Sequence, residues 1–137
     1  LVNDATVFSP SFESAFDLVV CDVPCSGAGV IKNKPDIMLN RKEEDVAALA
    51  ELQHKIISTA GRYVRPGGTL CYSTCTVFRE ENEGVANAFL AENPEFEKVP
   101  ARCDKVKADE DGYVRLYPQT DGCDGFFVAK FRRKEND

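Results

Sequence analysis

The sequence predicts an α/β fold built on a largely parallel β-sheet. Short apolar runs typical of strands alternate with longer segments in which apolar residues keep helical spacing. The order strand, helix, strand, helix, strand requires crossover connections, which join parallel strands of one sheet. At 137 residues the chain is one domain long, or one large piece of a domain.

The first half of the chain supplies two of the predicted strands and one helix. Phe16–Val23, "FDLVVCDV", is apolar on both faces, which is typical of a central parallel strand. Apolar residues keep helical spacing from about Glu43 to Val64. Arg65-Pro66-Gly67-Gly68 is expected to end that helix and turn the chain. Thr69–Thr74 is the second predicted strand.

The second half is predicted to add one helix and two strands. The helix runs from about Glu80 to Ala91, and Phe96–Val99 forms a short third strand. Asp104–Gly125 is acidic and rich in turn residues, so no regular element is expected there. Gly125–Phe131, "GFFVAKF", is a strong final strand, which we expect to be antiparallel to the others.

Composition and charge narrow the class of protein. The net charge of −6 argues against nucleic-acid binding by this chain alone, because binding through phosphate contacts needs a basic face. No apolar run is long enough to span a membrane, and the first residues do not resemble a secretory signal. Six cysteines without an export signal suggest a reducing compartment, so we expect a cytoplasmic protein with thiols that are unpaired, catalytic or metal-bound.

The two predicted parallel strands end in similar cysteine-containing stretches, "CDVPC" from Cys21 and "CYSTC" from Cys71. Ligands of parallel sheets bind at the carboxyl ends of the strands. If the strands are neighbours, Cys25 and Cys75 face one crevice with Asp22 between them. Cys21 and Cys71 lie inside the strands, where we expect them to pack as small apolar side chains.

Several kinds of chemistry fit such cysteines. Two C-x₃-C pairs have a spacing that zinc sites tolerate, but strand residues four apart lie roughly 13 Å from each other. A non-catalytic, thiol-rich zinc-binding or interaction module therefore remains the alternative interpretation. Alternatively, an activated thiol can add to an electron-poor carbon, such as C6 of a pyrimidine. A nearby carboxyl group and a second thiol would then handle the protons of the reaction. No role is assigned to Cys103 or Cys123.

Two motifs resemble those of a known family. "DVPCSGAG" at Asp22–Gly29 and "YSTCTVFREENE" at Tyr72–Glu83 resemble the RNA cytosine-5 methyltransferases of the NOL1/NOP2/Sun family. The likeness covers nearly the whole chain, and the segment "GVIKNKPDI" is most similar to the bacterial Sun/Fmu branch, which modifies small-subunit ribosomal RNA. The resemblance implies a Rossmann-like fold that uses S-adenosylmethionine, with RNA as the partner and no metal ion.

The resemblance also implies a role for individual residues. Cys75 would be the nucleophile that adds to C6 of the cytosine, and Cys25 would assist release of the methylated RNA. Asp22 would hydrogen-bond the base at N3, beside the methyl donor. Asp22 and Pro24 of the Asp-Val-Pro-Cys loop are expected to contact S-adenosylmethionine, and Asp4 is expected to contact its adenine. This loop replaces the Asn/Asp-Pro-Pro-Tyr type of amino-group methyltransferases, which favours methylation of carbon.

One departure from the family pattern is large. The family's glycine-rich cofactor loop does not occur in this chain and is expected before Leu1, so residues 1–137 are interpreted as a single partial catalytic domain, its carboxyl-terminal half. We expect the chain to be inactive alone. A partial sheet would leave the strand at Phe16–Val23 with an apolar edge, which is expected to bind the missing half of the domain or a second copy. The run Arg79–Glu83 is expected to supply helix N-terminal charge, with a positioning role near Cys75 left open.

Overall fold

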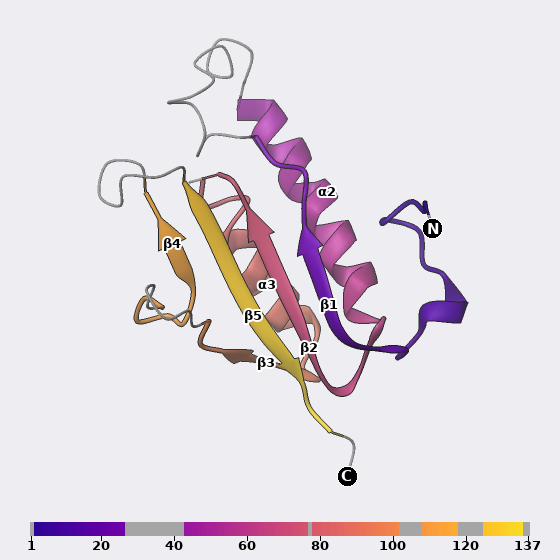
Figure 1. Ribbon diagram of the computed structural model, residues 1–137. Helices are drawn as coiled ribbons and strands as arrows, with labels where there is room; N and C mark the ends of the chain where they lie inside the picture. Colours follow the sequence, from indigo (N-terminus) through magenta and orange to yellow (C-terminus); the bar gives the residue numbers. More distant parts are fainter. Residues whose placement is uncertain (1, 27–42, 77, 102–107, 118–124, 136–137) are drawn as a thin grey trace.

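The structure, a computed structural model, describes residues 2–26, 43–76, 78–101, 108–117 and 125–135. It contains a five-stranded sheet in the order β1-β2-β5-β3, with β4 paired to β5 (Figure 1). The helical elements are a short 3₁₀ helix, η1, and the two α-helices α2 and α3. The bounds are η1 Pro10–Phe12, β1 Phe16–Asp22, α2 Glu43–Gly61, β2 Val64–Thr74, α3 Glu83–Glu92, β3 Phe96–Val99, β4 Val114–Leu116 and β5 Phe126–Arg133.

The strand directions agree with the predicted α/β class. β1 is parallel to β2, whereas β5 is antiparallel to β2, β3 and β4. Four of the described strands therefore run one way, and the final strand runs the other way, as predicted. β5 also lies between β2 and β3, so the third predicted strand is not a direct neighbour of the second.

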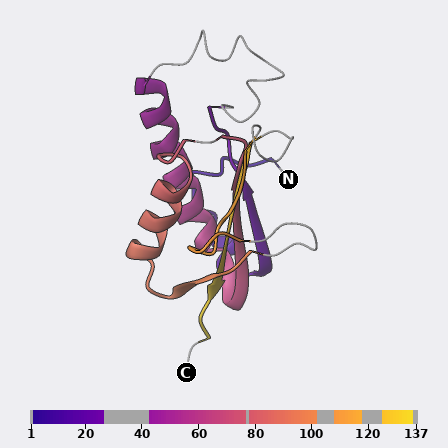
Figure 2. The ribbon, with the colours of Figure 1, turned by 90° about the vertical axis from the view of Figure 1, so that its left-hand side faces the viewer.

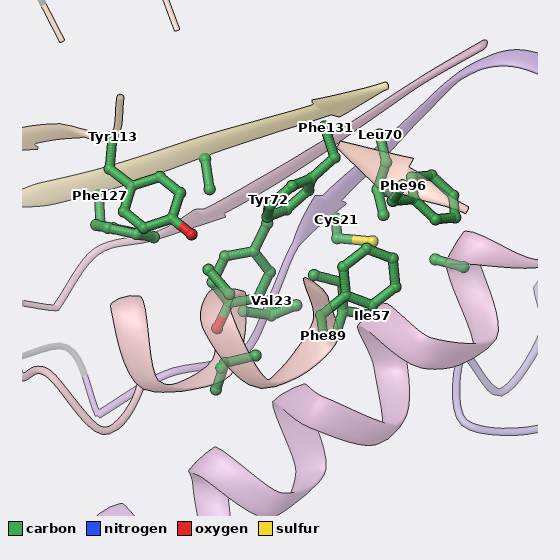
Figure 3. Close-up of a cluster of buried hydrophobic side chains, with 14 of the residues drawn as sticks. Cys21, Val23, Ile57, Leu70, Tyr72, Phe89, Phe96, Tyr113, Phe127 and Phe131 are labelled. Atoms are coloured by element: carbon green, nitrogen blue, oxygen red, sulfur yellow. The ribbon is translucent and has the colours of Figure 1, made fainter. Parts of the chain in front are cut away.

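Both α-helices cover the same face of the sheet (Figure 2). Between the helices and the sheet lies an apolar core in which aromatic rings from β2 and β5 meet side chains of α2 and α3 (Figure 3). The ring of Phe89 on α3 packs 5.0 Å from Phe96 and 5.3 Å from Phe131, measured between centroids. This core includes Cys21 of β1 and Leu70 and Tyr72 of β2, so it holds both strands near their carboxyl ends.

The first strand has the pattern of a central strand, and in this chain β1 lies at the edge of the described sheet and pairs with β2, as expected for a partial sheet. Its apolar character on both faces was read correctly, but one face packs on the core and the other is open. Cys21 is buried, whereas Phe16, Leu18 and Val20 are exposed by 42%, 57% and 62%. An exposed apolar row on an edge strand is a surface that another strand or layer can cover.

The chain turns between α2 and β2 earlier than the sequence suggested. α2 ends at Gly61, and Arg65-Pro66-Gly67-Gly68 lies within the first part of β2 as an irregularity, where Phe16 pairs with Val64 but Leu18 pairs with Thr69. Gly67 has a φ of +83°, a conformation that suits glycine. A Cβ on Gly68 would lie 2.9 Å from the carbonyl oxygen of Asp17, so the two strands approach closely here.

Two further differences come from tertiary contacts. α3 begins at Glu83 rather than near Glu80, because the preceding residues Glu81 and Asn82 are buried and their side chains bond to other segments. The acidic stretch after Asp104 also contains the short strand β4, which is held by its pairing with β5. Within the described part of the chain, no helix has the length and apolar character that a bilayer span requires.

Candidate active site

The two cysteine-containing loops meet at one end of the sheet. β1 and β2 are parallel neighbours, and their register pairs Asp22 with Ser73. The segments that follow β1 and β2 therefore leave the sheet side by side, and Cys25 Sγ lies 3.0 Å from Cys75 Sγ. Both thiols are part-buried and neither is in a disulfide. The structure thus brings together the two cysteines that sequence spacing had singled out.

Asp22 and Pro24 lie at the open side of this site. The Asp22 carboxylate is exposed, and its Oδ1 accepts a hydrogen bond of 3.2 Å from Ser73 Oγ. The Pro24 side chain is also exposed, while its carbonyl oxygen accepts a 2.8 Å hydrogen bond from Gln53 Nε2. The Asp22 carboxylate and the Pro24 ring are therefore open to a ligand. The hydrogen bonds from Ser73 and Gln53 hold the two residues in place.

The Cys75 thiol is stabilised in its protonated form. Burial raises its pKa to about 12, and the hydrogen bond and charge interaction with Cys25 and the negative charge of Asp22 act in the same direction. At neutral pH Cys75 is therefore a thiol rather than a thiolate. Because the thiolate is the nucleophilic form, addition to an electrophile requires a proton acceptor at the site.

The other described cysteines differ from each other. Cys21 belongs to the core, and burial raises the pKa of its thiol to about 12, so it packs as predicted. The prediction that Cys71 packs in the same way is wrong. The register sets Cys71 beside Val20 on the face opposite the helices, where it is only half-buried. Cys103 and Cys123 lie outside the described residues.

A metal-binding cluster was the alternative interpretation of these cysteines. Among the described residues no group of three or more His, Cys, Asp or Glu side chains is placed to hold a metal ion. The register explains this arrangement, because it sends Cys21 and Cys71 to opposite faces of the sheet. The geometry therefore offers two adjacent thiols in place of a four-thiolate cage.

Asp4 lies in the segment before η1, outside any strand. Its Oδ1 accepts hydrogen bonds from the backbone N–H and the hydroxyl of Thr6, at 2.9 and 2.7 Å. These bonds lower the pKa of the Asp4 carboxyl group below its ordinary value. This segment contacts the end of α2, where Thr59 Oγ1 donates a 3.4 Å hydrogen bond to the carbonyl oxygen of Thr6, and the predicted contact of Asp4 with adenine stays a prediction.

Sequence reasoning missed the polar groups behind the thiols. Glu81 has no exposed surface, and it accepts hydrogen bonds from Ser26 and Gln53. Asn82 bonds to Thr74 and Thr76 on either side of Cys75. The run "REENE" was the available signal, but it was interpreted mainly as charge at a helix N-terminus. Nothing in the local sequence tells a buried glutamate from an exposed one.

A pocket of about 130 Å³ is lined in part by Thr76, the residue after Cys75. It mixes aromatic surface with two arginines, and one of these, Arg115, is held by the carboxylates of Asp109, Asp111 and Glu83. Arg79 is 90% exposed. The residues that line the pocket are Thr76, Arg79, Asn82, Glu83, Arg115, Tyr117 and Phe126.

Comparison with known proteins places the chain among methyltransferases. The family model described as 16S rRNA methyltransferase RsmB/F matches residues 2–132. A relative in Bacillus subtilis (strain 168), described as a probable ribosomal RNA small subunit methyltransferase B, is 41% identical over 140 residues. That alignment covers 96% of this chain and 31% of the relative, so the chain spans about a third of the length of that protein.

Solved structures share the fold. The crystal structure of PH0851 matches with a TM-score of 0.89 and 34% identity, covering 97% of this chain and 30% of that one. The structure titled NSun6 from Pyrococcus horikoshii with SFG matches with a TM-score of 0.71 and 30% identity, covering 85% of this chain and 30% of that one.

Proposed function

Because the chain belongs to the RsmB/F family of 16S rRNA methyltransferases, we propose that it forms part of an enzyme that methylates C5 of a cytosine in small-subunit ribosomal RNA. The methyl donor is S-adenosylmethionine. The observation that carries the proposal is the pair of part-buried thiols, Cys25 and Cys75, 3.0 Å apart at the carboxyl ends of two parallel strands. Methylation of an amino group has no use for such a pair, whereas attack through a carbon adduct needs one thiol to add and a second group to help it leave.

Cys75 is the nucleophile in this proposal. Its sulfur bonds to C6 of the cytosine, the C5=C6 electron pair shifts toward C4 and N3, and N3 takes a proton. Asp22 suits the accompanying proton transfer, because its carboxylate is exposed at the site and its charge acts on the Cys75 thiol. The proton that leaves Cys75 can pass through Asp22 to N3, which balances the step and generates a nucleophilic C5.

Cys25 serves in release. After methylation the C5–H bond breaks, its electron pair re-forms the C5=C6 double bond, and the C6–S bond breaks with its pair returning to Cys75. A Cys25 thiol 3.0 Å away can give its proton to the departing sulfur. The proton released from C5 then restores the Cys25 thiol, and N3 gives its proton back through Asp22 to solvent, so the protein returns to its starting state.

S-adenosylmethionine would supply an electrophilic methyl group. The exposed Asp22 carboxylate and the exposed ring of Pro24, both at the strand ends, fit a ligand that carries polar groups and an apolar body. Asp4 is assigned to the adenine on the resemblance of its short motif. The pocket beside Thr76, with Tyr117 and Phe126 in its wall, offers aromatic surface of the kind on which RNA bases stack.

The chain is proposed to act as the carboxyl-terminal part of a larger catalytic domain. Its coverage of only 31% of the Bacillus relative supports this, as does the open apolar row at Phe16, Leu18 and Val20 on β1. The residues that complete the cofactor site would pack against this edge. The 137-residue chain alone is therefore expected not to transfer label from methyl-labelled S-adenosylmethionine to 16S rRNA, and transfer by the purified chain would overturn this part of the proposal.

The roles of the two thiols are tested by substitution in the complete enzyme. With cytosine-containing rRNA and S-adenosylmethionine, Cys25→Ala should accumulate a covalent protein–RNA adduct, because release is blocked. Cys75→Ala should form no adduct and no 5-methylcytosine. Cys71→Ala is the matched control, since Cys71 lies on the face opposite the helices, and it should behave as wild type. Adduct formation by Cys75→Ala would exchange the two roles. Absence of the adduct in Cys25→Ala, together with stoichiometric zinc in the purified protein, would favour the zinc-binding module instead.

A further inference from the structure

Two consecutive polar residues, Glu81 and Asn82, are buried just before α3 and have no part in the proposed chemistry. Glu81 is 0% exposed and Asn82 is 4% exposed. Burying a carboxylate is costly unless hydrogen bonds replace its water. The hydrogen bonds of these two side chains therefore indicate which segments their burial stabilises.

Glu81 holds the loop that carries Cys25. Its Oε1 accepts hydrogen bonds from the backbone N–H of Ser26 at 2.7 Å and from Gln53 Nε2 at 3.0 Å, and its Oε2 accepts one from Ser26 Oγ at 2.7 Å. Gln53 Nε2 also donates to the carbonyl oxygen of Pro24 at 2.8 Å. The residues directly before and after Cys25 are thus tied to one carboxylate and one amide.

Asn82 holds the segment that carries Cys75. Its Oδ1 accepts a 2.6 Å hydrogen bond from Thr74 Oγ1, and its Nδ2 donates a 3.0 Å bond to the carbonyl oxygen of Thr76. The hydroxyl of Thr76 lies 2.9 Å from Ser26 Oγ, which links the two loops directly. The residues on both sides of Cys75 are therefore fixed by one amide.

The backbone between these side chains is itself anchored. The hydroxyl of Tyr72 donates a 2.5 Å hydrogen bond to the carbonyl oxygen of Glu81, and Tyr72 lies in the core on β2 (Figure 3). Glu81 and Asn82 thus connect the two cysteine-bearing loops to the core through hydrogen bonds. A shift of either residue would move one thiol relative to the other.

We propose that Glu81 and Asn82 are positioning residues that set the separation of the two reactive thiols, Glu81 through the Pro24–Ser26 turn and Asn82 through Thr74 and Thr76. The inference rests on the proposed function for its purpose, since neither residue touches the reacting atoms. It also makes a claim about geometry that needs no RNA and no methyl donor. Misplacing a reacting group by about 1 Å can cost on the order of a hundredfold in rate.

The test measures how fast Cys25 and Cys75 are linked by diamide in the complete enzyme. The two thiols lose two protons and two electrons to diamide, which becomes its hydrazine, and peptide mapping by mass spectrometry quantifies the disulfide. Glu81→Ala and Asn82→Ala should each slow linking at least about tenfold. In the methylation assay the same variants should lower kcat while KM for RNA changes little.

Two variants serve as controls. Glu80→Ala removes an exposed carboxylate one residue away and should link at the wild-type rate. Glu81→Gln keeps an oxygen for the Ser26 N–H and for Gln53, and Ser26 Oγ can turn its proton to Thr76, so this variant should restore linking. A general loss of packing would not be rescued by so small a change.

The outcomes separate the two proposals. Wild-type linking by folded Glu81→Ala and Asn82→Ala overturns the positioning role. If Glu81→Ala does not fold, Gln53→Met removes the donor to Glu81 and Pro24 at similar length, and wild-type linking in that variant overturns the role in the same way. If Glu81→Ala and Asn82→Ala link slowly but the Cys25→Ala enzyme forms no RNA adduct, the positioning role stands and the proposed function is rejected.

Discussion

The Cys75 thiol should react with electrophiles far more slowly than an ordinary cysteine at neutral pH. Its pKa rises from 9.0 to about 12, with burial as the largest cause. At pH 8 this lowers the thiolate fraction from about one in ten to about one in ten thousand, roughly a thousandfold. Because the site is half-open and water screens its charges, we take about tenfold as the smallest effect that supports the reasoning.

The assay is the pH dependence of alkylation by iodoacetamide, followed at Cys75 by peptide mass spectrometry between pH 7 and 10. In the folded protein the rate should keep rising by about tenfold per pH unit up to pH 10. In urea-unfolded protein it should level off near pH 9. The shape of the profile reports the pKa independently of access to the thiol. A folded-state profile that levels off near pH 9 would refute the reasoning.

Substitution should separate the causes of the raised pKa of Cys75. Asp22→Asn removes one negative charge from the site, and Cys25→Ser removes the thiol partner, so each should raise the alkylation rate of Cys75 by several-fold. Neither should restore ordinary reactivity, because burial remains. Asp17→Asn makes the same chemical change at the other end of β1 and serves as the control.

The raised pKa of Cys75 also links folding stability to pH. Since folded Cys75 holds its proton more tightly than unfolded Cys75, its contribution to stability is complete below pH 9 and is lost as the pH rises from 9 toward 12.

The β1 edge and the Arg115 cluster give two further predictions. The purified chain should self-associate through the open row on β1, and Val20→Lys should weaken the association at least about tenfold in sedimentation equilibrium, whereas a wild-type chain that stays monomeric at high concentration contradicts this. Arg115→Met should cost about 1–3 kcal/mol in urea unfolding at pH 7, because it removes hydrogen bonds to several carboxylates, while exposed Arg79→Met should cost little. The Arg115 hydrogen bond lowers the pKa of Asp111, so this stabilisation is present above the unfolded carboxyl pKa and is lost as the pH falls through the folded one; an equal loss at pH 3 and pH 7 would contradict it.

Much of the fold follows from local patterns. The apolar runs at β1, β2 and β5, and the helical spacing over α2, lie where the structure has these elements. Both cysteine-bearing loops could be placed together from the sequence, because parallel neighbours deliver their carboxyl ends to the same edge of a sheet. The limits of α2 and α3 were less accurate, since they depend on which residues the tertiary structure uses elsewhere.

Burial was harder to predict than element type. Cys21 and Cys71 occupy equivalent places in similar motifs, yet one is in the core and the other faces away from the helices. The choice depends on the register between β1 and β2, and on the helices covering a single face of the sheet. No pattern within either strand records these facts.

The sequence by itself determined the α/β class, the strands that end in Cys25 and Cys75, and the resemblance to RNA cytosine-5 methyltransferases, because these depend on periodicity and on residues close together in the chain. Only the tertiary structure decided that Cys71 faces away from the helices, that the Cys75 thiol keeps its proton, and that Glu81 and Asn82 hold the two loops. Each of these depends on burial and on contacts between residues far apart in sequence. The physical reason is that desolvation and hydrogen bonding are set by what surrounds a group in space, which a one-dimensional pattern does not contain.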